Sequence, residues 1–250
     1  MNKRFYRLLF ITLILTTNNL FGQIPKNIFN EITEEKFDSK NFTISTKTLK
    51  QNVGIYHFGE SEAEWDLIFL PYKDSLVIQV WNGIWGEELG LKNQSWLHKC
   101  QTFNNVKIIG SKFYFGIYSG QFVDYKEGKT KTKAVILFSD PIEGRNYKRD
   151  SAEVGFYSTS IDTFFDDIER YGLSLVIKPE TFFAKKTKQE LKILRNTIYA
   201  NYGLVFQKDG EMYKYFSKKE WYQAWQKDVS HCLTNIEKIN LTTLKKFEQQ

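Results

Sequence analysis

Histidine, cysteine, proline and methionine are all scarce in this chain of 250 residues, which contains three, two, four and two of them. His57, His98 and His231 occur in none of the spacings at which histidines and cysteines bind zinc. The sequence also lacks a serine-nucleophile elbow, a phosphate-binding loop and a dinucleotide-binding fingerprint. We therefore predict no metal site, no cofactor and no catalytic residue, and we favour a protein that is not an enzyme. An active site assembled from scattered residues would escape this test.

Long apolar runs are also absent, except for one near the N-terminus. Lys3, Arg4 and Arg7 precede an apolar segment at 8–15, and the small residue Gly22 follows it. This order is typical of a secretory signal peptide, which we place at 1–22. The segment is shorter than the roughly 20 residues that span a bilayer, and an uncleaved anchor is the alternative. We expect an exported protein, periplasmic or extracellular, with no stable membrane span in its mature form.

Basic residues exceed acidic ones, and the excess lies at the C-terminal end. The formal net charge is +6, and residues 181–250 hold thirteen Lys or Arg against seven Asp or Glu. Such an asymmetry favours an anionic partner, although a solvated basic surface is the commoner explanation. We expect an anionic polymer or a protein of the cell envelope as the partner, and no nucleic acid.

The two cysteines, Cys100 and Cys232, are far apart in the sequence. An oxidising compartment would permit a disulfide between them. A chain of this length, however, can bury a hydrophobic core without a covalent link. The sequence favours two buried free thiols, with a disulfide as the alternative.

From residue 53 onward the chain consists of short runs rich in β-branched and aromatic residues, separated by turn residues. Phe113 and Phe115 alternate with Lys112 and Tyr114, which is typical of antiparallel strands with one buried face. We predict an antiparallel β-domain over 45–178, a small barrel or a sandwich, after a lead-in segment at 23–44. The predicted strands are 53–58, 66–70, 75–81, 105–109, 112–118, 120–125 and 133–138, with 155–158 and 173–177 as further candidates.

Helical spacing replaces this pattern toward the C-terminus. A short helix is predicted from Ser160 to Gly172. Capping boxes at Thr187 and Thr234 predict the starts of two further helices, and a shorter helix is expected at 211–216. The fold class is therefore α+β, with a small helical domain over 183–250 after the β-domain.

One stretch of this helical region carries a recognisable order of residues. Residues 194–206 read LRNTIYANYGLVF, and Tyr-Phe, Trp-Tyr and a helix at 235–240 follow. This order resembles the YARHG domain, a small helical module of exported bacterial proteins, over about the last 65 residues. The resemblance implies an envelope or extracellular setting and no established activity.

The chain departs from the motif for which that family is named, Tyr-Ala-Arg-His-Gly. It keeps Tyr199, Ala200 and Gly203 but has Asn201 and Tyr202 in the two middle positions. Any function of the family's arginine and histidine is therefore absent here. The residues themselves favour a structural interpretation, in which a helix ends and Gly203 turns the chain.

The same region is crowded with aromatic residues beside lysines. A module of this size cannot easily bury all of these rings, so we predict that some face outward and bind a glycan or another envelope polymer. Packing of these rings against the β-domain is the alternative. The candidate binding residues are Tyr199, Tyr202, Tyr213, Lys214, Lys218, Lys219, Trp221 and Tyr222.

Three functions are compatible with these features. We favour a binding or interaction protein of the bacterial cell envelope. The second candidate is a lipocalin-like barrel that carries a small apolar ligand, with Tyr56, Phe113 and Phe115 lining its lumen. The third is an envelope hydrolase, in which His57 would act with an acidic cluster at 60–66.

Overall fold

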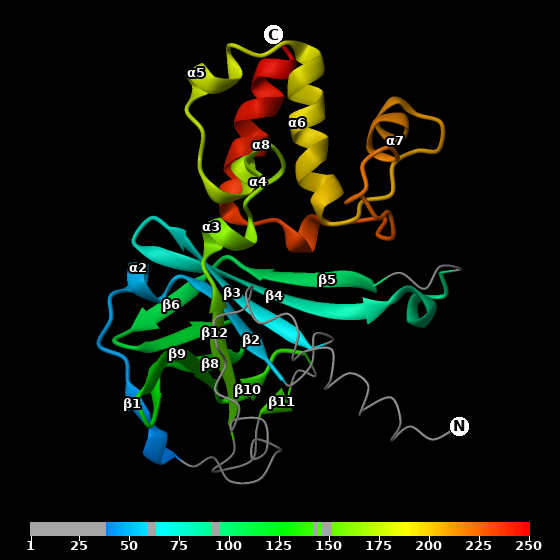
Figure 1. Ribbon diagram of the computed structural model, residues 1–250. Helices are drawn as coiled ribbons and strands as arrows, with labels where there is room; N and C mark the ends of the chain where they lie inside the picture. The colour runs from blue at the N-terminus through cyan, green and yellow to red at the C-terminus, as the bar shows by residue number, and fades with distance from the viewer. Residues whose placement is uncertain (1–38, 60–63, 92–95, 143–144, 147–151) are drawn as a thin grey trace, which may run out of the picture.

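The computed structural model describes residues 39–59, 64–91, 96–142, 145–146 and 152–250. The predicted signal peptide at 1–22, and residues 23–38 of the lead-in, lie outside the described residues. Figure 1 shows two stacked parts, a sheet and a group of helices that includes the C-terminus. The α+β class predicted from the sequence is confirmed.

Ten strands form one antiparallel sheet. Their order is β5-β4-β3-β2-β12-β9-β8-β7-β6, with β1 paired to β8, and β10 and β11 form a separate ladder. The strands are β1 (Phe42–Ile44), β2 (Gly54–Phe58), β3 (Trp65–Tyr72), β4 (Ser75–Trp85), β5 (Trp96–Phe103), β6 (Val106–Ile109), β7 (Lys112–Phe115), β8 (Tyr118–Glu127), β9 (Thr130–Leu137), β10 (Ser139–Asp140), β11 (Arg145–Asn146) and β12 (Glu153–Thr159).

The sheet is open, so the prediction of a closed barrel is wrong. Its end strands are β5 and β6, and they do not pair with each other. The Ser75 hydroxyl donates to the Val106 carbonyl at this opening (2.9 Å). Between β5 and β6, Asn104 instead accepts from the backbone N–H of Asn235 and donates to the carbonyl of Leu233, both in the helical part (2.5 and 3.0 Å). At this point the polar groups of Asn104 form hydrogen bonds with the helical part and not with a neighbouring strand.

Large aromatic side chains fill the interior of the curved sheet. Tyr56, Phe69, Phe113 and Phe122 are almost fully buried, and their rings meet at centroid distances of 4.8–6.3 Å, several of them edge to face. Phe115 joins the same cluster. The residues that the carrier interpretation places around a lumen are thus packed against one another.

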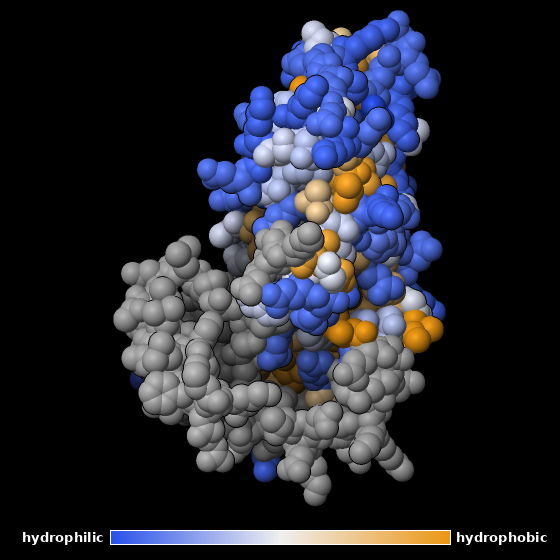
Figure 2. All heavy atoms as spheres, turned by 90° about the vertical axis from the view of Figure 1, so that its right-hand side faces the viewer, coloured by the Kyte–Doolittle hydropathy of each residue, from blue (hydrophilic) through white to orange (hydrophobic). Residues whose placement is uncertain are grey.

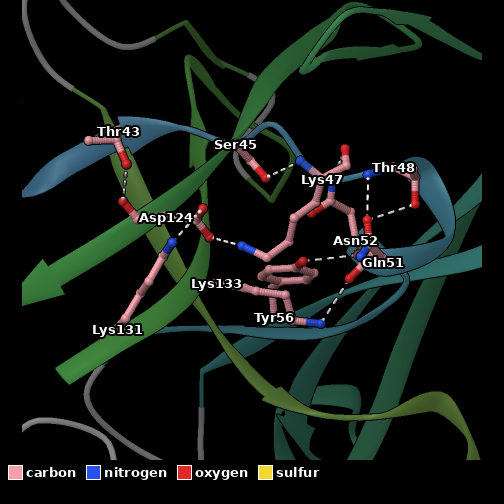
Figure 3. A network of polar contacts seen from close by, with 10 residues as sticks. All are labelled: Thr43, Ser45, Lys47, Thr48, Gln51, Asn52, Tyr56, Asp124, Lys131 and Lys133. Carbon is pink, nitrogen blue, oxygen red and sulfur yellow. Dashed lines mark hydrogen bonds and ion pairs between the residues drawn. The ribbon is translucent and has the colours of Figure 1, made fainter.

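A short segment of chain covers one end of this core. It contains β1 and α2 (Leu49–Asn52), and the Asn52 carbonyl accepts a hydrogen bond from the buried Tyr56 hydroxyl (2.9 Å). Figure 3 shows the cluster beside it, where Asp124 forms ion pairs with Lys47 and Lys131. Asp124 is nearly buried, so these two cations compensate the loss of its hydration.

The helical part is built on two antiparallel neighbours, α6 and α8, which lie side by side in Figure 1. Both begin with the predicted capping boxes, Thr187 with Glu190 and Thr234 with Glu237. The helices are α3 (Ile161–Phe164), α4 (Ile168–Leu175), α5 (Glu180–Phe183), α6 (Lys188–Asn201), α7 (Glu211–Phe216) and α8 (Asn235–Glu248), with the 3-10 turns η2 (Ser39–Asn41), η3 (Gly86–Leu89) and η4 (Ser230–Cys232).

The sequence prediction differs from the structure in several places. The helix expected from Ser160 to Gly172 is divided into α3 and α4, because the Asp167 side chain caps a new helix by accepting from the Arg170 N–H (3.0 Å). The candidate strand at 173–177 overlaps α4. Strand β5 was not predicted, since its mixed polar sequence gives a weak signal.

Candidate functional site

A covalent bond joins the two parts. Cys100 of β5 and Cys232 of η4 form a disulfide, with Cα atoms 5.6 Å apart. The expectation of two free thiols is therefore wrong. Helical packing places Cys232 beside β5, and no local sequence pattern indicates this proximity.

Hydrogen bonds reinforce the same junction. Gln79 of β4 donates from its amide to the Tyr202 hydroxyl and to the Cys232 carbonyl (both 3.0 Å). Gln79 is buried within the sheet, so these partners satisfy an amide that would otherwise be costly to bury. The disulfide and these hydrogen bonds hold the helical part firmly against β4 and β5.

Behind this junction lies a fully buried carboxylate, that of Glu237. It accepts hydrogen bonds from the hydroxyls of Ser174 (2.6 Å) and Tyr202 (3.0 Å) and from the Thr234 N–H (2.8 Å). Burial raises the pKa of Glu237 to about 7, although these donors act in the opposite direction. The carboxyl group therefore titrates near neutral pH inside the junction.

A cleft of about 360 Å³ opens where the sheet meets the helical part. We call it the tryptophan cleft, because Trp81 and Trp96 line its sheet side and Trp221 and Trp225 line its helical side. In Figure 1 it lies between the β4–β5 hairpin and the α7 region. Figure 2, which views the molecule from that side, shows a largely hydrophilic helical part with hydrophobic patches in its middle and toward the sheet. The remaining lining residues are His98, Cys100, Phe164, Arg170, Tyr171, Ala200, Asn201, Tyr202, Gly203 and Gln223.

Arg170 is the one cationic side chain of permanent charge in this lining. Its guanidinium lies 4.2 Å from the ring centroid of Trp221 and 4.6 Å from that of Tyr171. Its Nε donates to the Asn201 side-chain oxygen (2.8 Å), and the Asn201 amide donates back to the Arg170 carbonyl (3.1 Å). Within the described part of the chain, no carboxylate forms an ion pair with this guanidinium. Burial lowers the pKa of Arg170 from its usual value, yet the group stays charged at any physiological pH.

The position of Trp225 depends on Gly203. Gly203 has a φ of +75°, and a Cβ added there would lie 2.5 Å from the Trp225 ring and 2.8 Å from the Gln223 carbonyl. The Gly203 carbonyl accepts from the N–H groups of Trp225 and Gln226 (both 2.9 Å). Glycine is needed here both for the left-handed backbone and for the close approach of this wall of the cleft.

Residues 173–249 match the model of the YARHG domain. The C-terminal part of the chain is therefore a YARHG domain. It begins about ten residues before the resemblance recognised in the sequence and takes in the end of α4. No curated protein and no solved structure matches the chain.

The two positions at which this YARHG domain departs from the family's name both have partners in the structure. Asn201 holds Arg170, as described above. Tyr202 is buried, donates to Glu237 and accepts from Gln79. Both side chains therefore connect the motif to neighbouring elements, in agreement with the structural interpretation of this stretch.

Of the candidate binding residues in the YARHG domain, two line the cleft, Tyr202 and Trp221. Tyr213 and Tyr222 are half-buried beside Phe206 and Phe216 in a small aromatic core, and the Tyr222 hydroxyl donates to the Leu204 carbonyl (2.6 Å). The others lie elsewhere: Tyr199 packs in the core between the helices, and Lys214, Lys218 and Lys219 are exposed around the end of α7.

Sequence reasoning missed the sheet wall of the cleft and its arginine. Trp81 ends a predicted strand, and Trp96 lies in β5, which was not predicted. Nothing in their spacing connects them with residues more than a hundred positions later. Trp225 was recognised only as one of many aromatic residues. A usable signal was the concentration of tryptophan, since four of the six in the chain reach this cleft.

His57 and Asp66, which the hydrolase interpretation singles out, form a cross-strand pair on β2 and β3. The His57 Nδ1 lies 2.9 Å from an Asp66 oxygen. Residues 60–63 of the proposed acidic cluster lie outside the described residues. Neither His57 nor Asp66 lines the tryptophan cleft.

Two further searches concern the described residues alone. No group of three or more His, Cys, Asp or Glu side chains among them has the arrangement of a metal site. None of the helices in that part of the chain has the length and apolar character required to cross a membrane.

Proposed function

We propose that this protein is an exported, non-enzymatic binding protein of the bacterial cell envelope that holds its ligand in the tryptophan cleft. The observation that carries the proposal is the cleft itself, into which each of the two parts contributes two tryptophans. Ligand sites are typically concave, rich in aromatic side chains, equipped with a few polar groups and formed where structural units meet. The ligand-binding unit then comprises both proposed domains, 45–178 and 183–250.

Export is supported by two independent features. The first is the basic and then apolar N-terminal sequence, which has the order of a signal peptide. The second is the disulfide between Cys100 and Cys232, a bond that persists in oxidising compartments. A periplasmic or extracellular location follows from the proposal.

The expected partner is an anionic polymer or a protein of the envelope. Lys214, Lys218 and Lys219 are exposed in the same domain as Trp221 and would add attraction to an extended polymer beyond the cleft. A carrier of small apolar ligands is less favoured, because rings fill the interior of the sheet. A hydrolase is less favoured, because His57 and Asp66 lie outside the cleft lining.

The test is co-sedimentation of the mature protein with insoluble peptidoglycan at low and high salt. Trp225→Ala and Trp96→Ala remove one ring from each wall, and Tyr114→Ala, an exposed aromatic on β7, is the matched control. Binding that falls for both tryptophan variants and persists for the control supports the proposal. Equal retention of all four proteins would show that the cleft is not the binding site.

A further inference from the structure

The tryptophan cleft contains a cation that forms no ion pair among the described residues, although the charge of Asp167 favours its protonated form. Arg170 has five N–H donors, and within the same part of the chain only the one on Nε has an acceptor, Asn201. The cleft lining includes no Asp or Glu, and Asp167 uses a side-chain oxygen to accept from the Arg170 backbone N–H. A half-buried guanidinium in this setting is incompletely compensated unless a ligand supplies the negative charge.

The surroundings also decide from which side a ligand can reach this group. Trp221 and Tyr171 pack against the guanidinium, and the Asn201 side-chain oxygen accepts the hydrogen bond from its Nε. The two terminal nitrogens, with four N–H groups, remain for a ligand. A carboxylate approaching in the plane of the guanidinium can accept two parallel hydrogen bonds from such an edge, which is the geometry in which arginine binds carboxylates most strongly.

The rest of the cleft indicates what carries the carboxylate. Flat indole rings line the cleft together with hydrogen-bonding groups such as the side chains of Asn201 and Gln223. The buried Trp81 Nε1 has no hydrogen-bond partner among the described residues. The Asn201 side chain is already paired with Arg170, whereas the terminal N–H groups of Arg170 and the exposed Gln223 amide remain for a ligand. A pyranose ring presents apolar C–H faces to aromatic rings and hydroxyls to such polar groups.

We propose that the cleft binds an acidic saccharide, a pyranose unit that bears a carboxylate, and that Arg170 receives this carboxylate edge-on. The inference rests on the proposed function, because it names the ligand class of the same cleft. Asn201 is then a positioning residue that fixes the Arg170 side chain through its Nε. The tryptophans supply affinity for the sugar ring, and Arg170 selects the acidic form.

The experiment is a fluorescence and calorimetric titration of the mature protein with four soluble probes. Two are the alternating N-acetylglucosamine–N-acetylmuramic acid tetrasaccharide and its methyl ester, which differ only in charge. The others are the neutral N-acetylglucosamine tetrasaccharide and glucose 6-phosphate. The acid should bind about ten- to a hundred-fold more tightly than its ester, the range expected for a charge-assisted pair of hydrogen bonds.

Variants separate this inference from the proposed function. Arg170→Gln should reduce affinity for the acid to that of the ester and leave the ester unchanged, and Arg170→Lys should recover only part of the loss because lysine lacks the planar fork. Lys129→Gln, an exposed charge in the turn between β8 and β9 and outside the cleft lining, should change neither. Trp225→Ala should weaken both probes. Near-ultraviolet circular dichroism establishes that each variant retains its fold.

Each of the other possible results rejects the carboxylate, the ligand class or the proposed function. Equal affinity for acid and ester, with Trp225→Ala still weakening both, rejects the carboxylate and leaves the proposed function intact. Tight binding of glucose 6-phosphate without the acidic saccharide assigns Arg170 to phosphate and rejects the inference. If no soluble saccharide binds but peptidoglycan still sediments the protein through Trp225, the ligand class is wrong. Failure of every probe and of sedimentation rejects both proposals.

Discussion

The buried carboxyl group of Glu237 gives the protein a pH dependence of stability that can be worked out from the structure. The pKa of Glu237 rises from an ordinary value of 4.5 to about 7 because the carboxylate is removed from water. The folded state therefore holds this proton more tightly than the unfolded chain does. The resulting stabilisation is fully present below about pH 4.5 and is lost as the pH rises through about 7.

The magnitude follows from the same two values. One pKa unit corresponds to about 1.4 kcal/mol. Ionisation of Glu237 in the folded state therefore lowers the free energy of unfolding at pH 8 by about 3 kcal/mol relative to its value below pH 4.5. Glu237→Gln replaces the carboxyl with a neutral amide. Its oxygen can still accept from the Thr234 N–H, and its nitrogen can donate to the hydroxyl of Ser174 or Tyr202. The variant should thus lack most of this pH-dependent cost.

The assay is urea unfolding of the wild-type protein and of Glu237→Gln at pH 5 and pH 8, followed by tryptophan fluorescence. The difference between the two proteins should change by about 2.5 kcal/mol in favour of the variant on going from pH 5 to pH 8, because part of the effect is already lost at pH 5. Comparing proteins at each pH removes the contribution of every other titrating group that the two share.

The other capping box provides the matched control. Glu190 occupies the same position relative to Thr187 but is exposed, and the Thr187 backbone N–H lowers the pKa of Glu190. Its contribution is present above its unfolded pKa of 4.5 and is lost only below it, so the difference between the wild-type protein and Glu190→Gln should hardly change between pH 5 and pH 8. A wild-type-to-Glu237→Gln difference that is the same at pH 5 and pH 8 would refute the reasoning. Such a result would show that burial does not make the ionisation of Glu237 unfavourable.

Three other perturbations have definite expected outcomes. Replacing Cys100 and Cys232 together by alanine opens a loop of 132 residues and should lower the free energy of unfolding by up to about 5 kcal/mol, measured by urea unfolding. Gly203→Ala should destabilise the protein by about 1–3 kcal/mol and shift the emission of the displaced Trp225. Burial and a nearby lysine lower the pKa of Lys133 to about 8, so competitive acylation read by mass spectrometry should show its amine reacting with a midpoint near pH 8, well below that of ordinary lysines; a midpoint above pH 10 would contradict this.

Local patterns predicted the local structure well. The capping boxes at Thr187 and Thr234 mark the starts of α6 and α8, because a side-chain cap satisfies backbone donors only a few residues away. Alternation at Phe113 and Phe115 identified the buried face of β7 for a similar reason. Each of these signals depends on contacts within one element or between neighbouring strands. Residues that are close together in the sequence determine such contacts.

Closure of the sheet and the junction between the parts depend on distant contacts. β5 and β6 are not paired, and the side chain and carbonyl of Asn104, which lies between them, accept hydrogen bonds from Asn235 of the helical part. The division into α3 and α4 likewise depends on a cap at Asp167 that competes with continuation of one helix. The helix periodicity at 160–172 and the strand at β6 were recognised from the sequence, whereas β5 was not. For the helix, a competing hydrogen bond then determined where the element stopped.

The candidate site extends the same argument to function. Asn201 and Trp221 position Arg170, and the disulfide between Cys100 and Cys232, together with the hydrogen bonds of the same junction, holds the sheet wall opposite it. The bond that aligns the two walls forms only under oxidising conditions. The proposed site and the proposed compartment are therefore linked physically: the cleft is covalently secured only in a molecule that has left the reducing cytoplasm.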